Sequence, residues 1–332
     1  MKRTISIGSA ALALSLTLTT ASATAATTAS AHGVERPSTY SLTGDPVVGT
    51  TGGSKFEGIG VDKRTGVFYV SETTGGEIHR GQVSKANTRQ WLAGDGTHGR
   101  FTARGITVDS AGRVYIAGGP NSIDHPGAPD LWVYSRDGQL LAALRTGVDN
   151  AFLNDVAIGP DGAAYFTNSN APQVFRVVKK RGAWSVTTWV DATGTIATAD
   201  RVNLGGIVVG PDRRSLVVAQ GNVGKLWRFD LRSRVVSLID TGDTNLVGAD
   251  GLVRRGRTLW VVRNFPRVLT ALHLGRTART ASLLSEQPTD PDRVFTTAKL
   301  AGGRLLLVDS KFDENPVGLP PYQVVALDVE RS

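Results

Sequence analysis

The chain has 332 residues, a formal net charge of +8 and no cysteine. The lack of cysteine excludes disulfides, thiolate metal sites and thiol nucleophiles, so the fold must be held by its core or by closure of its architecture. The basic residues are not interleaved with aromatic residues, so we expect no nucleic-acid partner. A basic surface does favour anionic partners, such as a cell-wall polymer.

The first 31 residues have the pattern of a secretory signal peptide. Lys2 and Arg3 precede an apolar run over residues 5–18, and small-residue Ala-x-Ala sites follow, the last at residues 29–31. No later stretch is long and apolar enough for a membrane span. We therefore predict a secreted, extracellular protein whose mature chain, residues 32–332, is a single domain and a monomer.

Six similar segments follow one another along the mature chain. They begin at Glu57, Arg104, Asn154, Gly205, Asp250 and Thr296, at intervals of 45–51 residues. Each segment reads as a strand, a tight turn with Gly, Asp or Pro, and a second strand, as in "NDVAIGPDGAAYFTNS" from Asn154. A third and a fourth strand follow each of the first five segments, whereas the sixth is followed by a third strand only, because the chain ends near Glu330.

This repeat predicts an all-β, six-bladed β-propeller with four-stranded antiparallel blades. The segment "STYSLTGD", residues 38–45, resembles the fourth strands of the other repeats. We therefore expect the N-terminal strand to pair into the last blade and close the ring, which protects the sheet edges. The longest insertion, residues 118–130, is rich in Pro and Gly and is expected to be a loop.

The residues that open the six repeats should face one another at one mouth of the central channel. Five of these six residues are polar or charged, which explains why an amide, Asn154, opens an otherwise apolar strand. Glu57, Asn154 and Asp250 supply the oxygen ligands that calcium prefers. Arg104 offers the alternative, because its positive charge would balance the two carboxylates without a metal.

The motifs "FEGIGVD", "LNDVAIGPDGAAYFTNS", "GKLWRFDL" and "ADGLV" resemble the gluconolactonase/regucalcin (senescence marker protein) family of six-bladed propellers. The family's members are often metal-dependent lactonases or related ester hydrolases. The resemblance implies that Glu57 and Asp250 bind metal, that Asp250 acts as a general base, and that Asn154 contacts substrate or metal. Two positions depart from the family's pattern: Gly205 stands where a metal-binding asparagine is expected, and Phe152 where an arginine is expected.

Two functions follow from the sequence. The first is a calcium-dependent hydrolase of lactones or esters, in which Asp250 takes a proton from water and Arg104 stabilises the developing oxyanion. Arg104, Asn154 and the loop residue His125 would then bind the small-molecule substrate, with Arg104 replacing the missing arginine. The alternative is a non-catalytic extracellular propeller that binds a small ligand or a cell-wall component.

Overall fold

The computed structural model describes residues 36–45, 52–198, 203–315 and 318–329. All of them fall within one compact unit, Arg36–Ser332. The predicted signal peptide lies outside the described residues. No helix of the described part is long and apolar enough to cross a membrane.

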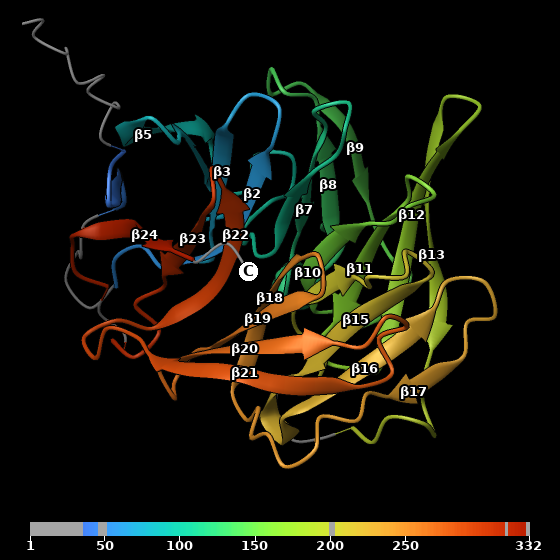
Figure 1. Cartoon of the computed structure of the whole chain (residues 1–332). Helices are drawn as coiled ribbons and strands as arrows, with labels where there is room; N and C mark the ends of the chain where they lie inside the picture. Colours follow the sequence, from blue (N-terminus) through green and yellow to red (C-terminus); the bar gives the residue numbers. More distant parts are fainter. Residues whose placement is uncertain (1–35, 46–51, 199–202, 316–317, 330–332) are drawn as a thin grey trace, which may run out of the picture. The chain divides into compact units, whose positions relative to one another are not determined.

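The described chain is almost entirely β-structure, as the sequence predicts (Figure 1). Four repeats each form one four-stranded antiparallel sheet in chain order. The strands of these sheets are β6 (Ile106–Val108), β7 (Val114–Ala117), β8 (Leu131–Tyr134) and β9 (Leu140–Leu144); β10 (Leu153–Ile158), β11 (Ala164–Asn168), β12 (Gln173–Lys180) and β13 (Ala183–Asp191); β14 (Ile207–Val209), β15 (Ser215–Gln220), β16 (Lys225–Asp230) and β17 (Val236–Leu238); and β18 (Ala249–Arg255), β19 (Thr258–Arg263), β20 (Val268–Leu274) and β21 (Ala281–Pro288). Two short helical segments, α1 (Asn121–Asp124) and η1 (Gly221–Val223), lie in connections.

The first and sixth repeats form a single eight-stranded sheet, which corrects the expectation of six separate sheets. Its order is β2 (Phe56–Asp62), β3 (Val67–Glu72), β4 (Ile78–Gln82), β5 (Lys85–Leu92), β1 (Thr39–Leu42), β24 (Tyr322–Asp328), β23 (Arg304–Asp309) and β22 (Phe295–Ala301). The two halves join where Ser41 of β1 pairs in parallel with Asn87 of β5, and the hydroxyl of Thr88 donates to the Ser41 carbonyl at 2.8 Å. The outer strands of the first and last repeats are therefore bonded to each other.

Pairing of the N-terminal strand with the last repeat is confirmed. β1 runs antiparallel to β24, with Tyr40 opposite Val324. The Tyr40 ring is fully buried, and its hydroxyl donates to the Val83 carbonyl at 2.9 Å and accepts from Arg304 at 3.0 Å. The strand thus contacts both the first and the sixth repeat.

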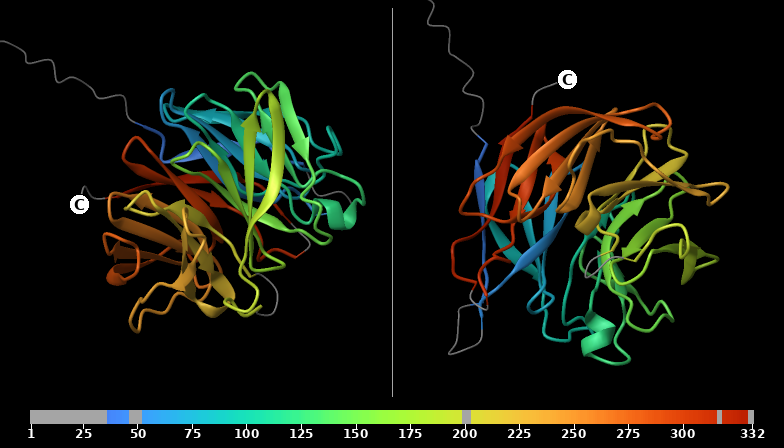
Figure 2. Two further views of the ribbon diagram at one scale, coloured as in Figure 1. Left: turned by 90° about the vertical axis from the view of Figure 1, so that its right-hand side faces the viewer. Right: turned by 90° about the horizontal axis from the view of Figure 1, so that it is seen from below.

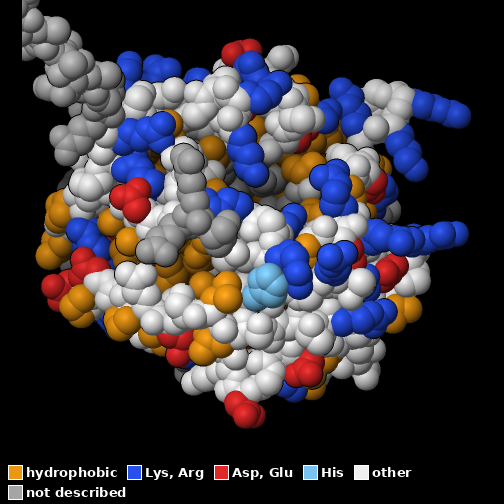
Figure 3. Space-filling model, in the orientation of Figure 1, with side chains coloured by type: hydrophobic (Ala, Val, Ile, Leu, Met, Phe, Trp, Pro, Cys, Tyr) orange, Lys and Arg blue, Asp and Glu red, His pale blue; other side chains and the backbone are white. Residues whose placement is uncertain are grey.

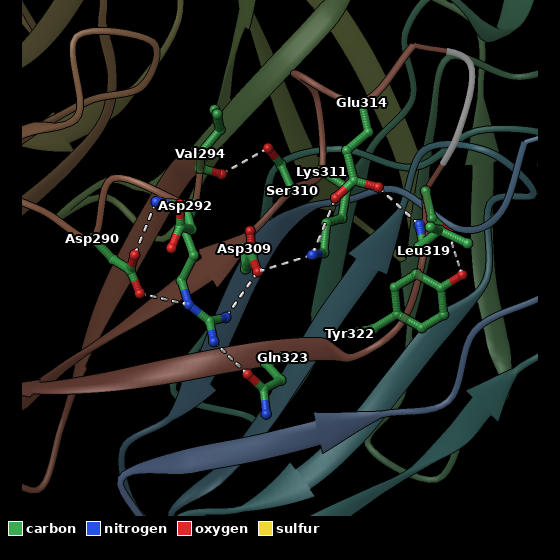
Figure 4. Close-up of polar contacts among 12 residues, drawn as sticks. Asp290, Asp292, Val294, Asp309, Ser310, Lys311, Glu314, Leu319, Tyr322 and Gln323 are labelled. Carbon is green, nitrogen blue, oxygen red and sulfur yellow. Dashed lines mark hydrogen bonds and ion pairs between the residues drawn. The ribbon is translucent and has the colours of Figure 1, made fainter.

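A polar network in the sixth repeat links the end of β23 to the start of β24 (Figure 4). Arg293 bonds Asp309 at 2.8 Å and Gln323 at 2.7 Å. Tyr322 donates to the carbonyl oxygens of Gly318 and Asp45. The chain just after β1 is therefore tied to the start of β24 by side chains as well as by the sheet.

The first strands of the six repeats contact one another in cyclic order, β2 to β6, β10, β14, β18, β22 and back to β2. In Figure 1 the labels of β2, β10, β18 and β22 lie toward the middle, and those of the outer strands β5, β13, β17 and β21 lie toward the periphery. Buried apolar residues of the described chain fall into clusters that each span two consecutive repeats. The sheets therefore pack face to face around a common centre, as in a propeller, and Figure 2 shows this arrangement from two further sides.

Candidate active site

The predicted ring residues lie at irregularities in the inner strands. The pairing of the first two strands shifts register beside Glu57, Asn154, Asp250 and Thr296. Such β-bulges re-aim side chains and are common beside active sites. Here they coincide with the polar residues that interrupt the apolar strands.

Glycine follows the ring residue in four repeats because the next repeat approaches its backbone. A Cβ atom on Gly58 would lie 2.1 Å from the Arg104 carbonyl oxygen, and one on Gly206 would lie 2.3 Å from that of Asp250. In the third repeat the equivalent residue is Asp155. Its carboxylate accepts from the backbone N–H of Ile207 at 3.2 Å, so it enters the ring as a third acidic side chain.

Glu57, Asn154 and Asp250 line one small cavity, of about 10 Å³, at the centre of the unit. A cavity of this size holds about one water molecule or one small ion. Asp155 and Thr297 line it as well, and the buried hydroxyl of Thr297 has no hydrogen-bond partner among the described residues. A buried unpartnered hydroxyl is typical of a site that a water occupies.

Arg104 pairs with Glu57 rather than with Asp250. Its guanidinium contacts the Glu57 carboxylate, donates to the Gly119 carbonyl, and lies 4.5 Å from the centre of the Phe152 ring. Phe152, which replaces the expected arginine, is therefore the surface on which Arg104 packs. The charge of Arg104 thus lies beside the position from which the family's arginine is missing.

The two carboxylates predicted from the sequence, Glu57 and Asp250, have different electrostatic surroundings. Burial raises the pKa of Glu57 even though the nearby Arg104 lowers it. Burial, followed by the charges of Glu57 and Asp155, raises the pKa of Asp250 well above its ordinary value. No ion pair of the described residues includes Asp250; its hydrogen bond comes from the Asn264 amide at 3.2 Å. Asp250 is therefore the acid of the ring that lacks a direct cationic partner.

Besides Thr297, three residues of the site were not predicted from the sequence. Asp155 follows the ring position, Asn264 follows the second strand of its repeat, and Lys299 lies with its Nζ 3.9 Å from Asp155 Oδ2. Each occupies a different position within its repeat, so an alignment of the residues that open the first strands does not identify them. An aspartate at a position where four of the six repeats have glycine is the sequence signal that could have identified Asp155.

His125 lies apart from the cavity-lining residues. Its imidazole is exposed and stacks on Phe101, with ring centres 3.6 Å apart. Asn121 fixes the loop that carries His125, because its side-chain oxygen accepts hydrogen bonds from the backbone N–H groups of Phe101 and Thr102. A substrate role for His125 stays a prediction from the sequence.

The side chains around Gly205 fit a hard cation on one side of the cavity. A Cβ atom on Gly205 would lie 3.7 Å from Asp250 Oδ1 and 3.8 Å from Asn154 Oδ1, so both oxygens face the same space. Calcium takes carboxylate, amide and water oxygens at relaxed geometry. Glu57 is the weaker donor, because Arg104 already contacts its carboxylate. Asn154 and Asp250 would therefore hold such an ion, with water in place of the missing asparagine.

The far ends of the inner strands enclose a second, larger cavity of about 450 Å³. Its wall combines apolar residues such as Val108, Ile158 and Val208 with charged ones. The charged lining residues are the basic Lys63, Arg64, Arg254 and Lys299 and the acidic Asp62 and Asp109. A volume of this size suits a small ligand. Lys299 lies between the two cavities. It lines the larger one, and its Nζ lies 3.9 Å from Oδ2 of Asp155, which lines the smaller one.

Comparison with protein-family models and with curated proteins finds no match. Comparison with solved structures finds many proteins of the same fold at low identity. A gluconolactonase of Xanthomonas campestris is 17% identical, with a TM-score of 0.58, over 84% of this chain and 87% of its own. A calcium-binding protein, regucalcin, of Agrobacterium tumefaciens is 15% identical, with a TM-score of 0.58, over 88% and 96%.

The allergen Mala s 1 of Malassezia sympodialis is 16% identical, with a TM-score of 0.63, over 88% of this chain and 96% of its own. These likenesses confirm the resemblance to gluconolactonase- and regucalcin-like propellers at the level of the fold. They do not transfer an activity, because one fold hosts many functions.

Proposed function

We propose that the chain is a hydrolase of lactones or simple esters, and that the cavity beside Asp250 is its active site. The observation that carries the proposal is a buried carboxylate, without a cationic partner among the described residues, beside space for one water molecule. A carboxylate whose pKa is raised by burial and by neighbouring charges is a stronger base than an ordinary aspartate, which suits it to general-base catalysis. The motifs that resemble the gluconolactonase/regucalcin family suggest lactones and esters as the substrate class.

In the proposed reaction, Asp250 takes a proton from a water molecule as the oxygen of that water bonds to the substrate's carbonyl carbon. The ester bond then breaks, and Asp250 returns the proton to the departing alkoxide oxygen. The guanidinium of Arg104 stabilises negative charge on the carbonyl oxygen, and the Asn154 amide orients the substrate. A calcium ion held by Asn154 and Asp250 would polarise the carbonyl group.

We further propose that the eight-stranded sheet serves as two of six blades, because one half is formed by the first repeat and the other by the sixth repeat with β1.

We also propose that the protein is a secreted, extracellular monomer. Lys and Arg side chains are spread over the face shown in Figure 3, which supports contact with an anionic cell-wall polymer.

The second candidate function is a non-catalytic propeller that binds a small ligand. The cavity of about 450 Å³ at the far ends of the inner strands favours it, because its volume and its apolar residues suit a small molecule. Its four basic side chains outnumber its two aspartates, which favours an anionic ligand. In this case the Arg104–Glu57 pair would be an internal counter-charge and the Asp250 cavity would have no catalytic role.

A calcium titration combined with a substrate panel tests the first function. Residues 32–332 are expected to open lactones or aryl esters with calcium present and to slow when a chelator is added. Calcium at a hundredfold excess over Kd would stabilise the fold by about 2.7 kcal/mol, so the melting temperature should rise in the parent and not in Asp250→Ala. If calcium leaves both proteins unmoved and the whole panel stays intact, the hydrolase proposal fails and the binding function takes its place.

A further inference from the structure

A second cluster of ionisable side chains lies in the first repeat, outside the cavity described above. It consists of Glu72 at the end of β3, Glu77 in the following turn and His79 in β4. One ligand atom from each residue lies within 4.8 Å of the other two. It is the one such group of three His or acidic residues in the part of the chain that the structure describes.

The two inner members of the cluster are buried, and each has one polar atom without a hydrogen-bond partner among the described residues. The side chains of Glu72 and His79 are each 1% exposed. Glu72 Oε2 and His79 Nε2 have no hydrogen-bond partner among the described residues. Leaving such atoms unpartnered is costly, so a missing group between them is expected.

The spacing of these atoms suits a shared metal ion better than direct contact. His79 Nε2 lies 3.6 Å from Glu72 Oε2 and 3.6 Å from Glu77 Oε2. This separation is too long for a hydrogen bond. Two ligand atoms bonded to one tetrahedral zinc ion at 2.0–2.2 Å lie about 3.4 Å apart, close to what is observed.

The remaining polar atoms of the cluster are oriented by neighbours. Thr74 donates to Glu72 Oε1 at 2.5 Å and Gln90 donates to Glu77 Oε1 at 2.7 Å, which leaves the other carboxylate oxygen of each directed at His79. His79 Nδ1 lies 3.5 Å from the Thr43 hydroxyl. Support of the outer ligand atoms by hydrogen bonds is typical of metal sites.

The charge of the cluster also calls for a cation. The buried guanidinium of Arg100 donates to the carbonyl oxygens of Gly76 and Ala93 and to the Tyr134 hydroxyl. The described ion pairs of Glu72 and Glu77 are therefore with His79 alone.

We propose that Glu72, Glu77 and His79 bind one divalent transition-metal ion of the zinc type, with water as the fourth ligand. Two carboxylates balance the charge of the ion, and the imidazole nitrogen favours zinc over calcium. The ion would connect the β3–β4 turn to the chain that follows β1, because Thr43 of that chain lies beside Nδ1 of the ligand His79. It would therefore stabilise the seam at which the first and last repeats meet.

Zinc binding to the metal-free chain of residues 32–332 tests this site. We expect one zinc ion per chain by elemental analysis, and a rise in melting temperature of roughly 5 °C at a hundredfold excess over Kd. Cobalt(II) in place of zinc should give the visible absorption of a tetrahedral site. Absence of bound zinc and of any thermal shift in the parent would overturn the proposal and leave His79 as an imidazole held between two carboxylates.

Variants separate this site from adventitious binding. His79→Gln and Glu77→Gln should lose the zinc ion and the thermal shift, whereas His273→Gln, in a partly buried histidine of β20, should keep both. If His79→Gln does not fold, Glu77→Gln decides the matter, because the Glu77 side chain reaches the surface. Zinc bound equally well by both cluster variants would contradict the assignment. The result is independent of hydrolysis at Asp250, since the two sites share no residue.

Discussion

A chain that lacks residues 32–46 is expected to be unfolded at 25 °C, whereas a chain that begins at residue 32 folds. The deletion removes β1, the strand that bonds to both β24 and β5. It exposes the apolar cluster between the sixth and first repeats and leaves the buried guanidinium of Arg304 without the Tyr40 hydroxyl. These losses together are comparable with the 5–15 kcal/mol that stabilises a typical native protein.

Circular dichroism and resistance to proteolysis measure the effect of the deletion. Point variants grade it: Tyr40→Ala should lose about 3–5 kcal/mol of unfolding free energy, because a fully buried ring is removed. Tyr40→Phe keeps the ring and should lose about 1 kcal/mol, the contribution of its hydroxyl group. Full thermal stability of the shortened chain would contradict closure by the N-terminal strand.

Arg104→Met is expected to lower the unfolding free energy by about 3 kcal/mol at neutral pH, because it leaves the Glu57 carboxylate buried without its cation. The loss should depend on pH. The pKa of Glu57 is already raised in the folded state and would rise further in the variant. A carboxyl group with a raised folded-state pKa favours folding below its unfolded-state pKa, and this stability is lost as pH rises through the folded-state value.

Urea unfolding at pH 5 and pH 8 measures this effect, and the defect should be larger at pH 8. Glu57→Gln in the same chain should recover much of the loss, since no buried charge then remains. Arg64→Met is the matched control, because Arg64 is half exposed and pairs with Asp62 at 3.5 Å, so its loss should be below about 1 kcal/mol. Equal losses in the two arginine variants would show that the Arg104–Glu57 pair has no special role.

The repeat made much of the fold predictable. The positions of the strands, the pairing of residues 38–45 with the last repeat and the gathering of Glu57, Asn154 and Asp250 all follow from one alignment of strand starts. The merging of the first and sixth sheets was not predicted. It depends on a single parallel bridge between Ser41 and Asn87, which no pattern in the sequence predicts.

The other parts of the two sites depend on contacts between repeats. Asn264 reaches Asp250 from the end of β19, and Lys299 approaches Asp155 from β22. Glu72, Glu77 and His79 are close in sequence, but burial and the lack of partners are what distinguish them from an ordinary polar turn. Such features arise from packing, so periodicity alone does not identify them.

The turnover of a lactone or aryl ester by the parent and by Asp250→Asn is the most direct test of the proposed active site. The amide keeps the shape of the side chain but cannot take a proton, so kcat should fall by about 10²–10⁴-fold. In the calcium-free parent, the residual kcat should rise with pH as Asp250, whose pKa is raised, loses its proton. Asp212→Asn, remote from the cavity, should keep full activity. A parent and an Asp250→Asn variant that turn over the substrate at the same rate would contradict the account.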